Sequence, residues 1–183
     1  KQTDLAIAYA SGVYAVQTGG EPYKEKMPDV KVIAAIFPSI AHIVVSEASG
    51  ITSFEQIKEE KYPLNVSVNA KGTFMEISAA ALFDAYGFTF DDITSWGGEI
   101  YYLPSSKSVE MLEVDDIDMF VTVGPIPSSR LIELAPVKPF IVLPISEAAL
   151  NLLVEELGAF KTTIPTDMYT FIDEELPTYG DFY

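Results

Sequence analysis

The run Asn69–Thr73 contains residue types that can bind an anion. It also joins a short apolar run to a helical pattern, so it is expected to lie at the start of a helix. At a helix start, free backbone N–H groups and the positive end of the helix dipole favour negative charge. Gly72 lets a ligand approach the backbone closely, Thr73 offers a hydroxyl and Lys71 supplies charge. The sequence therefore predicts that a ligand carboxylate binds at Gly72 and Thr73, with Lys71 and Phe74 beside it. A capped helix with a solvated lysine is the alternative.

Two other segments carry candidate ligand-binding residues at expected strand ends. Tyr9 and Ser11 precede a short apolar stretch, so Tyr9 is expected to form a wall of the cleft and Ser11 to hydrogen-bond the ligand. Gly124 and Pro125 follow an apolar strand, and open α/β sheets bind ligands at the carboxyl ends of their strands. A half-buried tyrosine, an N-cap serine and a plain connection are the alternatives at these positions.

Catalytic and metal-binding patterns are absent from the sequence. Cysteine is missing, and the one histidine, His42, lies in an apolar run, where a hydrogen-bonded core or hinge residue is the favoured interpretation. The acidic run Asp115, Asp116 and Asp118 lacks the glycine and the terminal glutamate of a calcium loop, so we expect a solvated turn. Only carboxylates and lysines remain as catalysts, and no pair of them stands out. We therefore expect no catalytic residue, no metal and no cofactor.

The net charge of −16, from 11 basic and 27 acidic side chains, argues against nucleic acid and anionic lipid surfaces as partners. The apolar runs are interrupted by polar residues and by proline, and they are too short to cross a bilayer. We therefore expect no direct membrane insertion of this segment. The chain opens at Lys1 without an initiator methionine, and we expect a signal peptide or lipid anchor upstream.

The alternation of short β-rich runs with longer periodic runs is typical of an α/β fold with a mostly parallel sheet flanked by helices. Thr73 and Glu76 have the spacing of a capping box, and Gly87 and Gly158 are expected to end helices. The expected strands are Leu5–Tyr9, Val30–Phe37, His42–Ser46, Leu64–Val68, Ile100–Leu103, Met119–Val123 and Phe140–Leu143. The expected helices are Ser53–Glu59, Phe74–Tyr86, Ser106–Val114, Ser128–Ala135 and Glu147–Leu157.

Polar or proline-rich crossings near Ser46 and Pro139 divide the chain into two expected lobes. One lobe is continuous and covers residues 47–139. The other is discontinuous, combines residues 1–46 with residues 140–183, and is expected to be incomplete. The division assumes a two-lobed fold, in which the two crossings act as hinges.

The order and spacing of several stretches resemble the TAXI family of extracytoplasmic solute receptors that serve TRAP transporters. The stretches that carry the resemblance are Asp4–Ser11, His42–Val45, Ser49–Ser53, Val66–Thr73, Ala85–Phe88, Ile117-Asp118 and Val123–Pro127. The resemblance implies a two-lobed type II periplasmic-binding-protein fold, truncated here at both ends.

The same resemblance implies a function for the chain. A periplasmic or other extracytoplasmic receptor would capture a small organic anion, such as an amino acid or dicarboxylate, and hand it to a TRAP membrane permease. Lys71 and Phe74 replace the smaller residues common at this turn, so the ligand's identity does not follow from the resemblance. A ligand-sensing effector domain of a regulator, or an enzyme on the same fold, is the alternative.

Overall fold

The computed structural model describes residues 5–19, 23 and 25–182. The helices, including two short 3₁₀ turns, are α1 (Ala10–Thr18), η1 (Glu47–Ser49), α2 (Phe54–Glu60), α3 (Phe74–Ala85), α4 (Phe90–Ser95), α5 (Ser105–Glu113), α6 (Ser129–Leu134), α7 (Glu147–Leu157) and η2 (Thr166–Met168). The strands are β1 (Pro38–Ser46), β2 (Asn65–Ser67), β3 (Glu99–Tyr101), β4 (Met119–Gly124), β5 (Phe140–Val142), β6 (Phe160–Ile164) and β7 (Leu176–Phe182).

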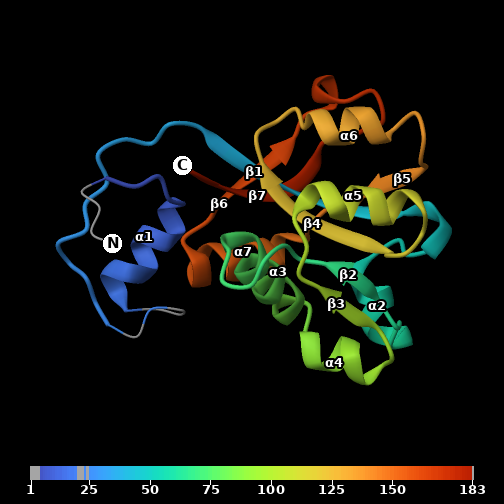
Figure 1. The fold of residues 1–183 in the computed structure, drawn as a ribbon, viewed down its shortest axis with the longest axis horizontal. Coiled ribbons are helices and arrows are strands. Elements are labelled where there is room, and N and C mark those ends of the chain that lie inside the picture. Colours follow the sequence, from blue (N-terminus) through green and yellow to red (C-terminus); the bar gives the residue numbers. More distant parts are fainter. Residues whose placement is uncertain (1–4, 20–22, 24, 183) are drawn as a thin grey trace.

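The strands form one central sheet in the order β3-β2-β4-β1-β7-β6, with β5 also paired to β1 (Figure 1). The expected parallel arrangement holds for β3, β2 and β4. The other half of the sheet pairs antiparallel, through β1 with β4, β5 and β7 and through β6 with β7. The apolar runs could not reveal this difference, because a strand that is buried on both faces is apolar along its length whether it pairs parallel or antiparallel.

Strand β1 organises the core because its residues alternate between the two faces of the sheet. Ala41, Ile43 and Val45 pack in a cluster that includes side chains of α2, α3 and α7. Ile40 and Val44 pack on the opposite face in a cluster that includes side chains of α5 and α6. The α/β class and the flanking of the sheet by helices on both faces are therefore as expected.

Two of the expected strands are wrong. Leu5–Tyr9 and Val30–Phe37 have no regular secondary structure and are not strands of the sheet, and Ile33 is 81% exposed. Strand-forming composition indicates a preference for extended backbone but does not supply a neighbouring strand, and neither segment is a strand of the sheet. Together they line an open groove of about 1160 Å³ next to α1. Conversely, β6, β7 and the short helix α4 were not expected from the sequence.

The expected division into lobes is not tested by this arrangement and stays a prediction. Strand β4 belongs to the segment 47–139, and it pairs with β1 from Ile40↔Gly124 to Val45↔Met119. The two segments of the chain therefore share one sheet. At the expected hinge positions, the N–H of Glu47 donates to the carbonyl oxygen of Pro139 at 3.3 Å.

Candidate ligand-binding site

The carboxyl ends of the three parallel strands meet at one edge of the sheet. The chain leaves β2 toward Asn69, leaves β3 toward Tyr102 and leaves β4 at Gly124. Helices α3 and α5 begin at this edge, on opposite faces of the sheet. Open α/β sheets bind ligands at such edges, so the structure brings the predicted turn at Gly72 and the predicted turn at Gly124 to the same edge.

A chain of polar side chains ties the three strand ends together. Asn69 has a left-handed backbone conformation with φ of 71°, and its side-chain oxygen accepts from the N–H of Ala70 at 2.7 Å. Its amide nitrogen lies 3.4 Å from the hydroxyl of Ser105, at the start of α5. That hydroxyl lies 3.2 Å from the hydroxyl of Thr122 on β4. The loop that holds the predicted site is therefore fixed to both neighbouring strands.

The start of α3 already receives a carboxylate from within the chain. The Glu76 side chain accepts from the N–H of Gly72 at 3.1 Å, and Thr73 Oγ1 accepts from the N–H of Glu76 at 3.4 Å. The expected capping box had Glu76 bonded to the N–H of Thr73, but this N–H donates instead to the carbonyl oxygen of Ala70 at 3.2 Å. The left-handed Gly72, with φ of 76°, turns its own N–H toward Glu76.

Tyr9 and Phe74 form an aromatic wall next to this helix start. Their ring centroids are 4.6 Å apart, with an angle of 34° between the ring planes. The hydroxyl of Tyr9 donates to the carbonyl oxygen of Val123 at 3.3 Å, one residue before Gly124. The structure thus brings together residues from all three predicted turns, although 114 positions separate Tyr9 from Val123.

Lys71 lies at the same edge, and its ammonium stands over the ring of Tyr102. The nitrogen is 4.3 Å from the ring centroid, which is a cation–π distance. Within the described part of the chain, Lys71 makes no ion pair with a carboxylate, in contrast to Lys107, Lys138 and Lys161. Its ammonium therefore contacts an aromatic ring and forms no salt bridge with a described carboxylate.

Ser11 is buried and is engaged by Asp181 of β7. Its N–H donates to the carboxylate at 3.1 Å, and its hydroxyl donates to the same group. Burial raises the pKa of Asp181, although the hydrogen bonds from Ser11 oppose this shift. Ser11 was predicted to bind the ligand, but in this structure its N–H and hydroxyl are bonded to the Asp181 carboxylate. This carboxylate caps the start of α1, where the N-cap residue Tyr9 makes no side-chain cap hydrogen bond.

A buried hydrogen-bond network holds the segment after β4, on the face of the sheet that α5 and α6 cover. Tyr169 accepts from the N–H of Ser128 at 2.6 Å, and its hydroxyl lies 2.9 Å from Nε2 of His42. His42 is 1% exposed, which confirms the prediction of a hydrogen-bonded core histidine. A Cβ atom at Gly124 would have no atom within 4 Å other than those of Gly124 and its chain neighbours, so the space beside this residue is open. Pro125 follows and is exposed.

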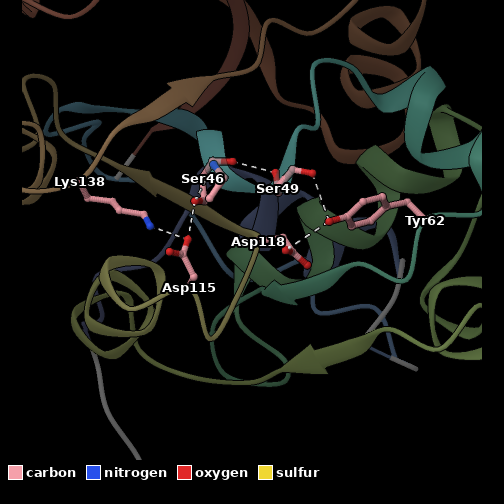
Figure 2. A network of polar contacts seen from close by, with 7 residues as sticks. Ser46, Ser49, Tyr62, Asp115, Asp118 and Lys138 are labelled. Atoms are coloured by element: carbon pink, nitrogen blue, oxygen red, sulfur yellow. Dashed lines mark hydrogen bonds and ion pairs between the residues drawn. The ribbon is translucent and has the colours of Figure 1, made fainter.

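Polar contacts gather at the opposite end of β1, close to the expected hinges (Figure 2). The hydroxyl of Ser46 donates to Asp115 at 2.8 Å, and Asp115 is paired with the buried Lys138 at 2.5 Å. This hydrogen-bonded ion pair lowers the pKa of Asp115. Asp118 accepts from the N–H of Asn65 at 2.8 Å and is half-buried. The expected solvated turn is therefore wrong for Asp118, because this carboxylate is half-buried and bonded to the backbone at the start of β2.

The contacts of several residues at the strand edge were missed by sequence reasoning. Asn69 lies in the predicted run Asn69–Thr73, and asparagine tolerates the left-handed conformation found there, but its contact with Ser105 was not predicted. Tyr102 gave no signal of its own, because aromatic residues in and beside strands more often pack in the core than bind a ligand. Trp96, for example, packs on Phe88 with ring centroids 5.8 Å apart, as part of the core around α4. Asp181 gave no signal, because its contact with Ser11 spans 170 positions.

Residues 5–19, 23 and 25–182 contain neither a metal-binding cluster nor a membrane-spanning helix. No three His, Cys, Asp or Glu side chains in this part of the chain gather closely enough to hold a metal ion. In the same ranges, no helix has both the length and the apolar character needed to cross a membrane.

Comparison with known protein families yields a match along nearly the whole sequence. The model of the NMT1-like family matches residues 1–182. This is a periplasmic-binding-protein-like family whose members are typically solute-binding domains. The central sheet flanked by helices agrees with such a fold and confirms the expected α/β class with helices beside the sheet. The chain therefore belongs to the NMT1-like family.

Proposed function

We propose that the protein is an extracytoplasmic solute receptor that binds a small carboxylate intact and passes it to a TRAP-type membrane permease, in the manner of the TAXI family. The observation that carries this proposal is the ammonium of Lys71, which lies beside the start of α3 and makes no ion pair with a described carboxylate, in a chain of net charge −16. An anionic solute needs such a local positive site, because the field of the whole protein repels it.

The contact of Glu76 with Gly72 supports a carboxylate as the chemical class of the solute. A carboxylate oxygen already accepts the N–H of Gly72 at 3.1 Å, next to Lys71. The N–H groups of Phe74 and Met75 have no acceptor among the described residues, as first-turn N–H groups of a helix often do not. A solute carboxylate takes the place of Glu76 or binds these adjacent groups. The ring of Tyr9 covers the apolar part of the solute.

A thermal-shift screen tests the proposal with amino acids, dicarboxylates and oxo-acids. A solute present at a hundred times its dissociation constant adds about 2.7 kcal/mol to the free energy of unfolding. For a protein of this size, that raises the melting temperature by roughly 5–10 °C. Lys71→Met and Thr73→Val should each shrink the shift. Lys58→Met, at an exposed lysine of α2, is the matched control and should leave it unchanged.

The transport role is tested in cells. Deleting the gene should abolish uptake of the carboxylate that gives the largest thermal shift, and cell fractionation should place the protein outside the cytoplasm. Unchanged uptake, or a cytoplasmic protein, would contradict delivery to a permease. A thermal shift produced only by uncharged sugars or by cations would contradict the proposal that the solute is a carboxylate.

A further inference from the structure

Tyr102 is the aromatic side chain over which the Lys71 ammonium lies. It follows β3 directly, is half-buried, and packs against the core cluster that contains α3. Lys71 itself is exposed and sits on a loop between β2 and α3. Its nitrogen nevertheless stands 4.3 Å from the centre of the Tyr102 ring. The ammonium of an exposed lysine thus lies over a ring that packs against the core.

The chemistry of this contact leaves the charge of Lys71 available. The face of an aromatic ring attracts a cation through its quadrupole and carries no net negative charge. An ammonium has three N–H donors, and contact with a ring face does not use all of them for hydrogen bonds. A carboxylate partner would neutralise the lysine, whereas the ring only orients it. The ring also reduces the side-chain freedom that Lys71 must lose when a ligand binds.

We infer that Tyr102 is a positioning residue for solute binding, which holds the Lys71 ammonium at the carboxyl ends of the parallel strands and so strengthens the binding of carboxylates. The inference rests on the proposed function and deepens it, because it names a residue that sets the preference for anions. The preceding residue, Tyr101, cannot take this role. It packs with the core cluster on the other face of the sheet, and its hydroxyl donates to Glu99 at 3.0 Å.

Isothermal titration with succinate, L-glutamate and 2-oxoglutarate tests this role. Tyr102→Leu should weaken the binding of any acid that the wild type binds by about two- to five-fold, the range of an exposed cation–π contact. Tyr102→Phe keeps the ring and should keep the affinity. Tyr101→Leu removes the neighbouring ring and should leave the affinity unchanged. Thermal unfolding of each variant without solute checks that the fold is retained.

A double-mutant cycle separates positioning from structural damage. In a Lys71→Met background there is no ammonium to hold, so Tyr102→Leu should have no further effect on affinity. Damage to the fold around Tyr102 would weaken binding equally in both backgrounds. Equal loss in both backgrounds, or an acid bound as tightly by Tyr102→Leu as by the wild type, would overturn the inference and leave the proposed function standing.

A measurement without solute separates the failure of the two proposals. After ¹³C-methylation of the lysines, which preserves their charge, the ring of Tyr102 should shift the methyl signal of Lys71 upfield in an NMR spectrum. The shift should persist in Tyr102→Phe and vanish in Tyr102→Leu, with Lys71→Arg identifying the signal. If the shift is present but the wild type binds none of the three acids, the proposed function fails and the role in binding fails with it. If the shift is absent, the positioning contact itself is refuted.

Discussion

Protonation of His42 should destabilise the fold, because both of its ring nitrogens are engaged in the neutral form. Nδ1 donates to the carbonyl oxygen of Ile40 at 3.1 Å, which assigns the proton to this nitrogen. Nε2 then accepts from the hydroxyl of Tyr169 at 2.9 Å. Burial lowers the pKa of His42 from 6.5 to about 4, although the carbonyl of Ile40 acts in the opposite direction. A proton on Nε2 would leave Tyr169 without its acceptor.

The direction and size of the effect follow from the two pKa values. The unfolded chain takes up a proton on His42 near pH 6.5, whereas the folded protein does so only near pH 4. The unfolded state therefore binds more protons between these values, and the free energy of unfolding falls as the pH is lowered through this window. One pKa unit corresponds to about 1.4 kcal/mol, so the loss is about 2 kcal/mol at pH 5 and approaches about 3.4 kcal/mol below pH 4.

Urea unfolding of the wild type and of His42→Gln at pH 7.5 and pH 5.0 measures this loss. The wild type should lose about 2 kcal/mol more than the variant between the two pH values. Carboxylates titrate in both proteins, so the difference between the two losses isolates His42. Because His42 is the only histidine, its Cε1–H signal also reports the pKa directly by NMR. A midpoint near 6.5 in the folded protein, or equal losses in both proteins, would refute this reasoning.

Three smaller changes test the packing of the sheet by urea unfolding at pH 7.5. Gly98→Ala places a methyl group 2.3 Å from the carbonyl oxygen of Leu64 and should cost about 3 kcal/mol, and full stability would contradict this packing. Gly124→Ala meets no atom within 4 Å and should change stability by less than about 0.5 kcal/mol; a larger loss would show that this edge is filled. Tyr179→Phe breaks a buried hydrogen bond of 2.8 Å to Ser78 and should cost about 1–2 kcal/mol, so an unchanged midpoint would argue against that bond.

The fold was predictable where local signals decide it. Helix α7 begins and ends at the expected residues, because Ser146 caps its start and the left-handed Gly158 ends it. The strand at Leu5–Tyr9 was mispredicted because composition reports the preference of a segment and not its neighbour. Strands β6 and β7 were missed for a related reason. Only Phe160 and Ile164 of β6 are apolar, and the strand is stabilised by its ladder with β7, from Phe160↔Gly180 to Ile164↔Leu176.

The position of the candidate site was predictable, but its contacts were not. The turn at Gly72 follows a buried strand and opens a helix, and both features can be read locally. The engagement of Ser11 by Asp181 joins residues 170 positions apart, and the stacking of Tyr9 on Phe74 depends on how α1 sits at the sheet edge. The contact of Lys71 with Tyr102 likewise requires the parallel pairing of β2 with β3.

Equilibrium dialysis with radiolabelled succinate, L-glutamate and 2-oxoglutarate tests the central claim most directly. The account predicts saturable binding of at least one of these acids by the wild type, at one molecule per chain and with weaker binding by Lys71→Met. Mass spectrometry of the released acid should show it chemically unchanged, as a receptor requires. Binding of none of the three acids, equal binding by Lys71→Met, or conversion of the acid to a product would contradict the assignment of a carboxylate receptor.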